Sequence, residues 1–406
     1  MKIVIATAVY YPQINGVAVF SHNLARGLVA RGLEVLVICP SQTGRSYTQV
    51  VDGVKVCYLK SVDVKVYPDQ IHEIPKRRRL FYRHGLKVSV FPKREVAEIL
   101  TDFQPDVVHV QVSDPVGLSV VSWARKHEVP VVTTEHNQPE VLTDPLHVPR
   151  ILKKPANALL YSYFRNRQSK SDFVTMPTKQ AIYNLLSRGR ELGVPVAAVS
   201  NGVDLSRFKP GKAPAEIYEK YGLMRDAPTV LYVGRVDPEK KVGLVIEAFL
   251  KADVPGAQLV IVGDGVDKAK LMRKYGDVDA VKFLGRVVGS DLYELYKVGW
   301  VFATASEIET QGIVLIEAAA CGLPLVAVDA GAVSEVCIDE ENGYLCESGS
   351  VPEIAAAMKK ILTDDKLRAI FSKKSLAVAK EHDFETTLDR FINIYNKVAE
   401  GRKTNR

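Results

Sequence analysis

Two glutamates, Glu309 and Glu317, flank a glycine in the last third of this 406-residue chain, and their spacing is typical of a ligand site. Residues 309–312 are expected to form a loop that leaves a buried strand, and a helix is expected to begin at Ile313. Gly312 lets the backbone approach a ligand, and the N–H groups at the start of the helix could hold an anionic diphosphate. The two carboxylates could accept hydrogen bonds from sugar hydroxyls. The segment therefore favours a sugar nucleotide as the ligand.

An exposed position on a helix surface is the alternative explanation of Glu317, because such pairs of glutamates are common in helical sequences. The neighbours of Glu317 argue against this explanation. They are apolar on both sides, with Ile313, Val314, Leu315 and Ile316 before it and Ala318, Ala319 and Ala320 after it. A carboxylate is costly to bury in such surroundings without a partner, so we interpret Glu317 as functional.

Two cations follow another predicted strand, about seventy residues upstream of Glu309. The apolar residues 229–233 end at a glycine and lead into Arg235, a short turn and Lys240. Open parallel sheets bind ligands at the carboxyl ends of their strands, which is where both side chains would lie. There they could neutralise charge on a departing nucleoside diphosphate, and each charge-assisted contact is worth about 1.5–3 kcal/mol. Lys241, by contrast, is expected to be an ordinary surface cation.

Further motifs stand in a fixed order along the chain. They are YYPQINGV at residues 10–17, SNGVD at 200–204, GR-x4-K at 234–240, VGDG at 262–265, FLGRV at 283–287 and E-x7-E at 309–317. In this order and spacing they resemble the motifs of the retaining family 4 glycosyltransferases of the GT-B fold, and the resemblance covers nearly the whole chain. The sequence ETQG at 309–312, where EGFG is more common, resembles the members that glycosylate diacylglycerol.

The resemblance implies an α/β protein of the GT-B type, with two Rossmann-like domains that face each other across a cleft. Residues 1–200 would bind the acceptor, residues 201–383 would bind the nucleotide sugar, and residues 384–406 would form a helix that crosses back to the first domain. The alternation of predicted strands and helices supports two mainly parallel sheets. Strands are expected at 2–8, 35–39, 54–59, 107–111, 129–134, 173–176, 196–200 and 229–233, a linker at 201–214, and helices at 351–380 and 384–398.

The resemblance also implies roles for single residues. Arg235, Lys240, His136 and Glu309 would be catalytic, with the two cations at the leaving diphosphate, His136 near the transferred sugar and Glu309 at its hydroxyls. The donor would be bound by Gly16, Gly263, Arg286, Val287, Thr310, Gln311, Gly312, Ile313 and Glu317. Among these, Gly16 would lie on the loop after the first strand and let it approach the diphosphate, Arg286 and Val287 would lie at the base, and Glu317 at the ribose. His109, at the end of a neighbouring strand, is expected to be a core residue.

Retention of configuration is attributed in this family to front-face attack, in which the leaving phosphate oxygen accepts the proton of the acceptor hydroxyl. No protein nucleophile is evident in the sequence. No Asp-x-Asp pair follows a predicted strand and no metal-ligand cluster is visible. We therefore expect no metal ion and no cofactor, with the nucleotide sugar as co-substrate.

The composition is that of a globular enzyme, with 47% hydrophobic residues and a mean hydropathy of +0.00. A chain of 406 residues is long enough for two domains with their own cores. The five cysteines include no CxxC pair, so reduced thiols and no structural zinc are expected. The apolar first nine residues are too few to span a bilayer and are interpreted as a strand, which indicates a cytoplasmic protein.

Positive charge is concentrated in the first half of the chain. Residues 1–200 carry a net charge of +10, whereas the remainder carries −3. Cations alternate with aromatic residues in one segment, at Lys76, Arg77, Arg78, Arg79, Phe81 and Tyr82. Such a segment could contact the acceptor or lie on an anionic membrane surface, at about 1 kcal/mol per cation. A solvated loop is the alternative, and nucleic acid is not favoured because no nucleic-acid-binding module accompanies the cations.

These observations favour transfer of a hexose, with UDP-glucose as donor and a lipid such as diacylglycerol as acceptor, by a cytoplasmic protein bound peripherally to the inner face of the membrane. A GDP-mannose-dependent mannosyltransferase and a transferase acting on a soluble acceptor are the alternatives. A sugar-nucleotide epimerase and a binding protein without catalysis rank lower. A dehydrogenase is disfavoured because no G-x-G-x-x-G motif follows the first predicted strand.

Overall fold

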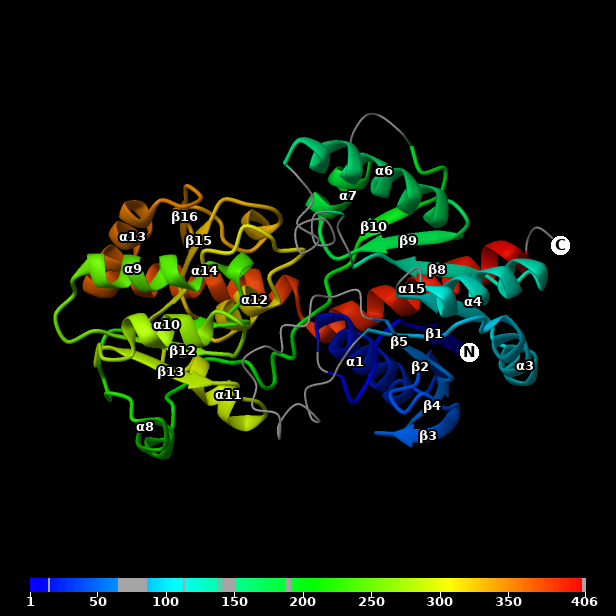
Figure 1. Ribbon diagram of the computed structural model, residues 1–406, viewed down its shortest axis with the longest axis horizontal. Helices are drawn as coiled ribbons and strands as arrows, with labels where there is room; N and C mark the ends of the chain where they lie inside the picture. The colour runs from blue at the N-terminus through cyan, green and yellow to red at the C-terminus, as the bar shows by residue number, and fades with distance from the viewer. Residues whose placement is uncertain are drawn as a thin grey trace. The chain divides into compact units, whose positions relative to one another are not determined.

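The computed structural model describes residues 1–13, 15–64, 86–111, 114–136, 139, 150–186 and 191–403. The chain divides into two compact units (Figure 1). Unit 1 contains residues 1–200 and 388–406, and unit 2 contains residues 201–387. Each unit is an α/β structure with its own sheet, as the GT-B fold requires.

Unit 1 is built on an eight-stranded sheet with the order β10-β9-β8-β7-β1-β2-β4-β3. Its strands are β1 (Lys2–Ala6), β2 (Glu34–Pro40), β3 (Tyr47–Val51), β4 (Val54–Leu59), β7 (Val107–Val110), β8 (Val131–Thr134), β9 (Phe173–Met176) and β10 (Val196–Ala198). Every neighbouring pair is parallel except β3 and β4. The inner strands are mainly apolar and their residues are mostly buried, because helices cover both faces of a parallel sheet.

The other elements of unit 1 are mostly helices. They are α1 (Gly16–Ala30), α3 (Lys93–Phe103), α4 (Pro115–Lys126), α6 (Arg150–Gln168), α7 (Lys179–Leu186), the later part of α15 (Phe384–Lys403), and the hairpin of β5 (Val62–Val64) and β6 (Leu86–Val88). The central strand β1 pairs with β2 on one side and with β7 on the other. The order of strands therefore reverses at β1, and ligands of open α/β sheets bind beyond the carboxyl ends of strands at such a point.

Unit 2 is built on a six-stranded parallel sheet with the order β13-β12-β11-β14-β15-β16. Its strands are β11 (Thr229–Val233), β12 (Gln258–Val262), β13 (Val281–Gly285), β14 (Val301–Ala303), β15 (Leu325–Val328) and β16 (Gly343–Cys346). Its helices are α8 (Ala215–Tyr221), the 3-10 turn η1 (Pro238–Lys240), α9 (Val242–Ala252), α10 (Lys268–Tyr275), α11 (Ser290–Tyr296), α12 (Ile313–Ala320), η2 (Val333–Glu335), α13 (Val351–Thr363) and α14 (Asp365–Glu381). Helices α9 and α13 pack side by side (Figure 1). Here the strand order reverses at β11, between β12 and β14.

Most strands predicted from the sequence are confirmed, although several are one to two residues shorter than expected. The helices predicted over residues 351–380 are confirmed as two, α13 and α14. Asp364 separates them because it has an extended backbone and its carboxylate accepts hydrogen bonds from the N–H groups of Lys366 and Leu367, both at 3.0 Å. The segment 201–214, interpreted as a linker, packs onto the core of unit 2 through Val203, Phe208 and Ala213.

Two further observations concern the cysteines and the membrane. All five cysteines are free and buried, as the sequence predicted for reduced thiols. Within the described parts of the chain, the structure contains no helix with the length and apolar character needed to cross a bilayer.

Candidate active site

Two strands of the sheet in unit 2 are followed by a glycine at the carboxyl edge. Gly234 and Gly263 follow β11 and β12, with φ angles of +155° and +150° that favour glycine. A Cβ atom on Gly263 would lie 1.8 Å from the carbonyl oxygen of Gly234. Contact between neighbouring loops therefore already explains this glycine, and the role of Gly263 in donor binding stays a prediction.

Arg235 is held between two carboxylates as it leaves β11. Its guanidinium donates to Asp237 and, at 2.6 Å, to Glu239, while 63% of its side chain stays exposed. Asp237 is itself buried and accepts the N–H of Val266 at 3.0 Å, which fixes the position of the pair. Burial alone would lower the pKa of Arg235, but Asp237, Glu239 and Glu309 outweigh burial and hold the pKa above its usual value. The guanidinium is thus charged, oriented and partly open to solvent.

Lys240 and Glu309 are brought into direct contact. The Lys240 ammonium lies 2.6 Å from Glu309 Oε1, and the two side chains are only 16% and 15% exposed. The same ammonium donates to Ser306 Oγ at 3.3 Å. Lys241, expected to be an ordinary surface cation, is partly exposed and forms an ion pair with Glu307. Lys240, predicted to contact the diphosphate, and Glu309, predicted to contact the sugar hydroxyls, therefore neutralise each other in this structure.

The charges around Arg235 do not sum to a cationic site. Three cations, Arg235, Lys240 and Lys241, form ion pairs with four carboxylates, Asp237, Glu239, Glu307 and Glu309. With all seven groups ionised, the cluster carries one net negative charge. An incoming diphosphate would therefore have to replace a carboxylate as the partner of a cation, and Lys240 has a single carboxylate to exchange.

Gly312 begins the helix that was predicted to face the diphosphate. Its φ of +72° is left-handed, and the helix α12 that follows has no side-chain cap at its N-terminus. The first N–H groups of such a helix have no partner within the helix and attract anions. Gln311, in the same loop, is buried and its Oε1 accepts the N–H of Asn201 at 3.1 Å. This bond holds the loop to the first residue of unit 2, and direct contact of Thr310, Gln311 and Ile313 with a donor stays a prediction.

Glu317 lies one helix turn further along and is paired with a tyrosine. Tyr296, the last residue of α11, is buried and donates its hydroxyl to Glu317 Oε2 at 2.6 Å. The glutamate keeps some exposed surface, yet its carboxyl is enclosed closely enough that burial raises its pKa to about 7, while Tyr296 acts in the opposite direction. Glu317 is therefore partly buried and hydrogen-bonded, and its role at the ribose stays a prediction.

Arg286 and Val287 directly follow β13, at the same edge of the sheet. Arg286 is exposed, whereas Val287 packs partly against the core of unit 2. The contact of Arg286 and Val287 with the base stays a prediction.

In unit 1, Gly16 stands at the beginning of α1 rather than on a loop. Asn15 caps the helix by accepting the N–H of Ala18 at 2.9 Å. Among the described residues, a Cβ atom on Gly16 would meet nothing within 4 Å, so none of them requires glycine there. Absence of a protein contact is compatible with a ligand that approaches the start of α1, as was predicted.

His136 is buried just after β8 and belongs to a chain of polar groups. Its Nε2 lies 2.8 Å from Gln111 Oε1, an acceptor, so the proton is on Nε2 and Nδ1 of the neutral ring can accept. Gln111 also donates to His109, which contacts Tyr395 Oη and Thr134 Oγ1 at 2.7 Å each. Burial lowers the pKa of His136 to about 4, so the ring is neutral at physiological pH.

The prediction that His109 is a core residue is confirmed, since it is fully buried and burial lowers its pKa to about 3. Gln111 was missed from the sequence. Its position at the end of β7, one strand from His136, is the signal that could have identified it.

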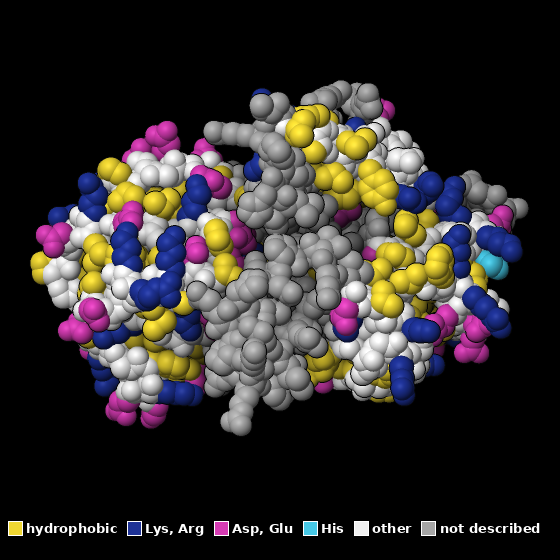
Figure 2. Space-filling view, in the orientation of Figure 1, with side chains coloured by type: hydrophobic (Ala, Val, Ile, Leu, Met, Phe, Trp, Pro, Cys, Tyr) yellow, Lys and Arg dark blue, Asp and Glu magenta, His cyan; other side chains and the backbone are white. Residues whose placement is uncertain are grey.

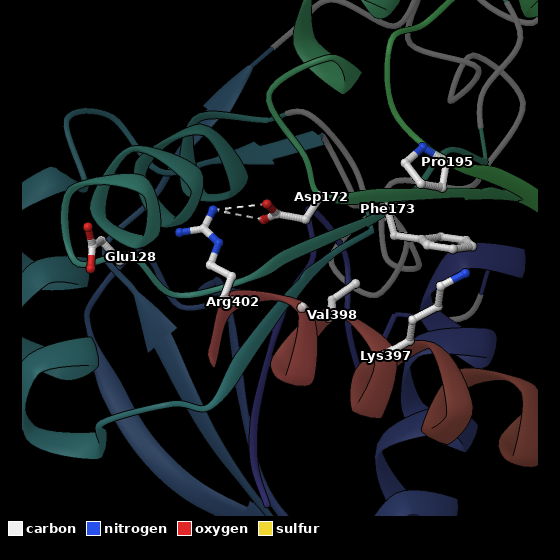
Figure 3. A pocket seen from close by; sticks show the side chains of 8 residues that line it. Glu128, Asp172, Phe173, Pro195, Lys397, Val398 and Arg402 are labelled. Carbon is white, nitrogen blue, oxygen red and sulfur yellow. Dashed lines mark hydrogen bonds and ion pairs between the residues drawn. The ribbon is translucent and has the colours of Figure 1, made fainter. Parts of the chain in front are cut away.

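A cavity of about 370 Å³ in unit 1 lies at the opposite edge of the sheet, where β9 and β10 begin. Figure 3 shows Arg402 and Asp172 directed toward each other across it, at 2.9 and 3.1 Å between Arg402 Nη2 and the carboxylate oxygens. Phe173 and Val398 supply part of its apolar wall. The cavity is separate from the carboxyl edge that carries His136 and Gly16.

Some predictions cannot be followed in the structure. Lys76, Arg77, Arg78, Arg79, Phe81 and Tyr82 lie outside the described residues. Among the described residues, no group of three or more potential ligands could hold a metal ion.

Comparison with known families gives two adjoining matches. The model described as Glycosyltransferase Family 4 matches residues 14–207, and the model described as Glycosyl transferases group 1 matches residues 215–377. Together they cover most of both units.

Similar proteins carry several related names. An alpha-monoglucosyldiacylglycerol synthase of Acholeplasma laidlawii is 28% identical over 80% of this chain and 80% of its own. The sulfoquinovosyl transferase SQD2 of Arabidopsis thaliana is 27% identical over 77% of this chain and 60% of its own. A GDP-mannose-dependent alpha-mannosyltransferase of Mycobacterium tuberculosis is 26% identical over 100% of this chain and 98% of its own.

Solved structures share the fold. Sucrose-phosphate synthase from Thermosynechococcus elongatus superposes with a TM-score of 0.75 at 19% identity, covering 99% of this chain and 100% of its own. HepE of Anabaena in complex with UDP-glucose superposes with a TM-score of 0.68 at 18% identity, covering 100% of both chains.

Proposed function

The chain belongs to the family 4 glycosyltransferases of the GT-B fold, and on this premise we propose that it transfers a hexose from a nucleotide sugar to a hydroxyl of a lipid, with retention of configuration. The favoured donor is UDP-glucose and the favoured acceptor is diacylglycerol. The protein would act peripherally on the inner face of the membrane, without a metal ion.

The contact between Lys240 and Glu309 is the observation that carries the proposal. A diphosphate placed at the carboxyl end of β11 offers the Lys240 ammonium a stronger partner than one carboxylate, because it carries more charge. Exchange of partners would release Glu309 to accept hydrogen bonds from the hydroxyls of the sugar. One rearrangement would thus prepare both halves of the donor site.

Other residues would stabilise the negative charge that develops as the diphosphate leaves. Arg235, oriented by Asp237, and the open N-terminus of α12 would stabilise the charge on the leaving diphosphate. The bond from the anomeric carbon to the phosphate oxygen breaks while the bond to the acceptor oxygen forms on the same face, and the acceptor proton passes to the phosphate. Neutral His136, with Nδ1 as an acceptor, would bind a hydroxyl of the transferred sugar and take no proton.

The lipid acceptor is supported by ETQG at residues 309–312 and by the similarity to the monoglucosyldiacylglycerol synthase of A. laidlawii. The second candidate is mannosyl transfer from GDP-mannose. It is favoured by the similarity to the M. tuberculosis mannosyltransferase, which extends over the whole chain. Both candidates use the same diphosphate site and differ in the base and the hexose.

The test is a screen of UDP- and GDP-sugars against diacylglycerol, phosphatidylinositol and soluble sugars, with products identified by mass spectrometry and their anomeric configuration by NMR. We expect an α-linked hexosyl lipid from UDP-glucose, unaffected by a chelator. Transfer from GDP-mannose alone would select the second candidate, and transfer to soluble sugars alone would refute the lipid acceptor. Absence of binding to every UDP- and GDP-sugar in calorimetry would refute the proposed function altogether.

A further inference from the structure

Helix α6 of unit 1 has an unusual charge composition. Its 19 residues, RILKKPANALLYSYFRNRQ, contain five arginines and lysines and no aspartate or glutamate. A surface helix of a protein that is surrounded only by water normally mixes both signs of charge. Helix α6 therefore presents a purely cationic set of charged groups.

One side of α6 is packed within unit 1. Phe164 is buried in a small cluster with Met176 of β9 and with Ala181 and Leu185 of α7, and Tyr161 packs against the same cluster. These contacts account for part of the apolar surface of the helix.

A second apolar strip on α6 faces solvent. Leu152, Leu159 and Tyr163 are 54%, 73% and 41% exposed. They are seven and four positions apart, which are close to whole turns of a helix, so the three side chains lie along one line. Figure 2 shows hydrophobic side chains gathered over α6 and α7 on the visible face. Tyr183 of the contacting helix α7 is also exposed, at 70%.

Cations accompany the apolar strip. The Arg167 guanidinium lies over the ring of Tyr163, at 5.0 Å from its centroid. Lys154 is exposed two positions after Leu152, which places it about 200° around the helix from the strip. Leu and Tyr on one face of a helix and Lys and Arg on the rest of it are the pattern of helices that lie in the plane of a membrane surface. The aromatic hydroxyls of Tyr163 and Tyr183 suit the headgroup region, where one end of a ring is apolar and the other hydrated.

We propose that the face of α6 formed by Leu152, Leu159 and Tyr163 binds an anionic lipid surface. The inference rests on the proposed function in one respect, since a lipid acceptor requires the enzyme to reach a membrane. A protein partner or a second copy of the chain is less suited to this face, because unit 1 as a whole is also cationic and no acidic group lies on α6 to pair with a cationic copy. Anionic headgroups satisfy both the cations and the apolar strip.

The experiment is flotation of the full chain with two kinds of vesicles, phosphatidylcholine alone and phosphatidylcholine mixed with phosphatidylglycerol. The test variant is Leu159→Glu, which places a carboxylate in the middle of the strip. The matched control is Ile370→Glu on α14 of unit 2, an apolar residue that is 64% exposed and outside the proposed face. Both positions are exposed, so neither change disturbs a core.

We expect the unaltered chain to bind the anionic vesicles in preference to the neutral ones and to be released as salt rises. Leu159→Glu should weaken this binding on the order of tenfold, because a leucine that would be buried in the lipid is replaced by a carboxylate that the anionic headgroups repel. Ile370→Glu should leave the binding unchanged. Equal binding by both variants, or no preference for anionic vesicles, would overturn the inference.

Two measurements separate this inference from the proposed function. UDP-glucose binding in the absence of vesicles tests the donor site and should be the same in both variants and the unaltered chain. Transfer to diacylglycerol dispersed in detergent tests the acceptor. Normal transfer in detergent, combined with vesicle binding that Leu159→Glu does not change, would refute the membrane-binding role of α6 and support the proposed transferase activity. Vesicle binding that depends on Leu159, without any transfer to lipid, would refute the lipid acceptor and support the membrane-binding role of α6.

Discussion

The hydrogen bond between Tyr296 and Glu317 allows a direct test of how the ribose end of the proposed donor site functions. Replacing Tyr296 by Phe keeps the buried ring and removes only the hydroxyl that donates to Glu317 Oε2 at 2.6 Å. The bond favours the ionised carboxyl, because its loss leaves the charge buried with one partner fewer. Tyr296→Phe should therefore raise the pKa of Glu317.

The magnitude follows from the pKa that the structure gives. Burial already raises the pKa of Glu317 to about 7. A hydrogen bond to a charged group is worth about 1.5–3 kcal/mol, and 1.36 kcal/mol corresponds to one pKa unit, so the pKa should rise by roughly one to two units. If the ionised form of Glu317 accepts from the ribose hydroxyls, UDP affinity in the variant should be lost near pH 7 and regained above roughly pH 9.

Calorimetric titration with UDP between pH 6 and 9.5 measures this shift. Tyr275→Phe is the matched control, since Tyr275 donates to Glu247 Oε1 at 2.9 Å in the same unit but on α10, away from the proposed site. The control should reproduce the pH dependence of the unaltered chain. A loss of affinity in Tyr296→Phe that is equal at every pH would refute the reasoning, because it would show a packing effect and no effect on ionisation.

Three further predictions concern the same site. Lys240→Ala should lower turnover on the order of 10²–10³, as for other preorganised charge stabilisers, and steady-state kinetics with UDP-glucose would contradict the assignment if the rate stayed near normal. Glu317→Gln should raise the free energy of unfolding by about 1–3 kcal/mol at pH 8, where the buried carboxyl must ionise, and the gain should disappear as pH falls through 7 toward 4.5; denaturant titrations at both pH values check the sign. Gly16→Ala should leave the melting temperature unchanged but weaken UDP binding, whereas Gly263→Ala should destabilise the fold, and equal melting temperatures for the two would show that the backbone contact at Gly263 is not tight.

Local patterns were sufficient for much of the fold. The strands at 54–59, 173–176 and 229–233 were predicted with the bounds that the structure shows, because each is a short, mainly apolar run with β-branched or aromatic residues. The edge strands β3, β5 and β6 were missed. Their alternating or short apolar patterns do not differ from those of loops, and pairing with a neighbour decides whether they become strands.

The placement of the site at the carboxyl edge also followed from order along the chain. A strand followed by Gly234 and Arg235 must release the arginine at that edge, and the same holds for Glu309 after β14 and His136 after β8. The partners of these residues did not follow. Asp237 and Glu239 are near Arg235 in the sequence, yet only the fold of the turn brings both onto one guanidinium.

The sequence by itself determined which strands exist, in what order they alternate with helices, and which polar residues stand at their ends, because backbone conformation and apolar periodicity are properties of short segments. Only the tertiary structure decided that Lys240 contacts Glu309, that Tyr296 donates to Glu317 and that His136 donates to Gln111. These pairs join residues on different elements. Their distances depend on how the strands are ordered across each sheet, and on the burial that this order imposes, neither of which any short segment specifies.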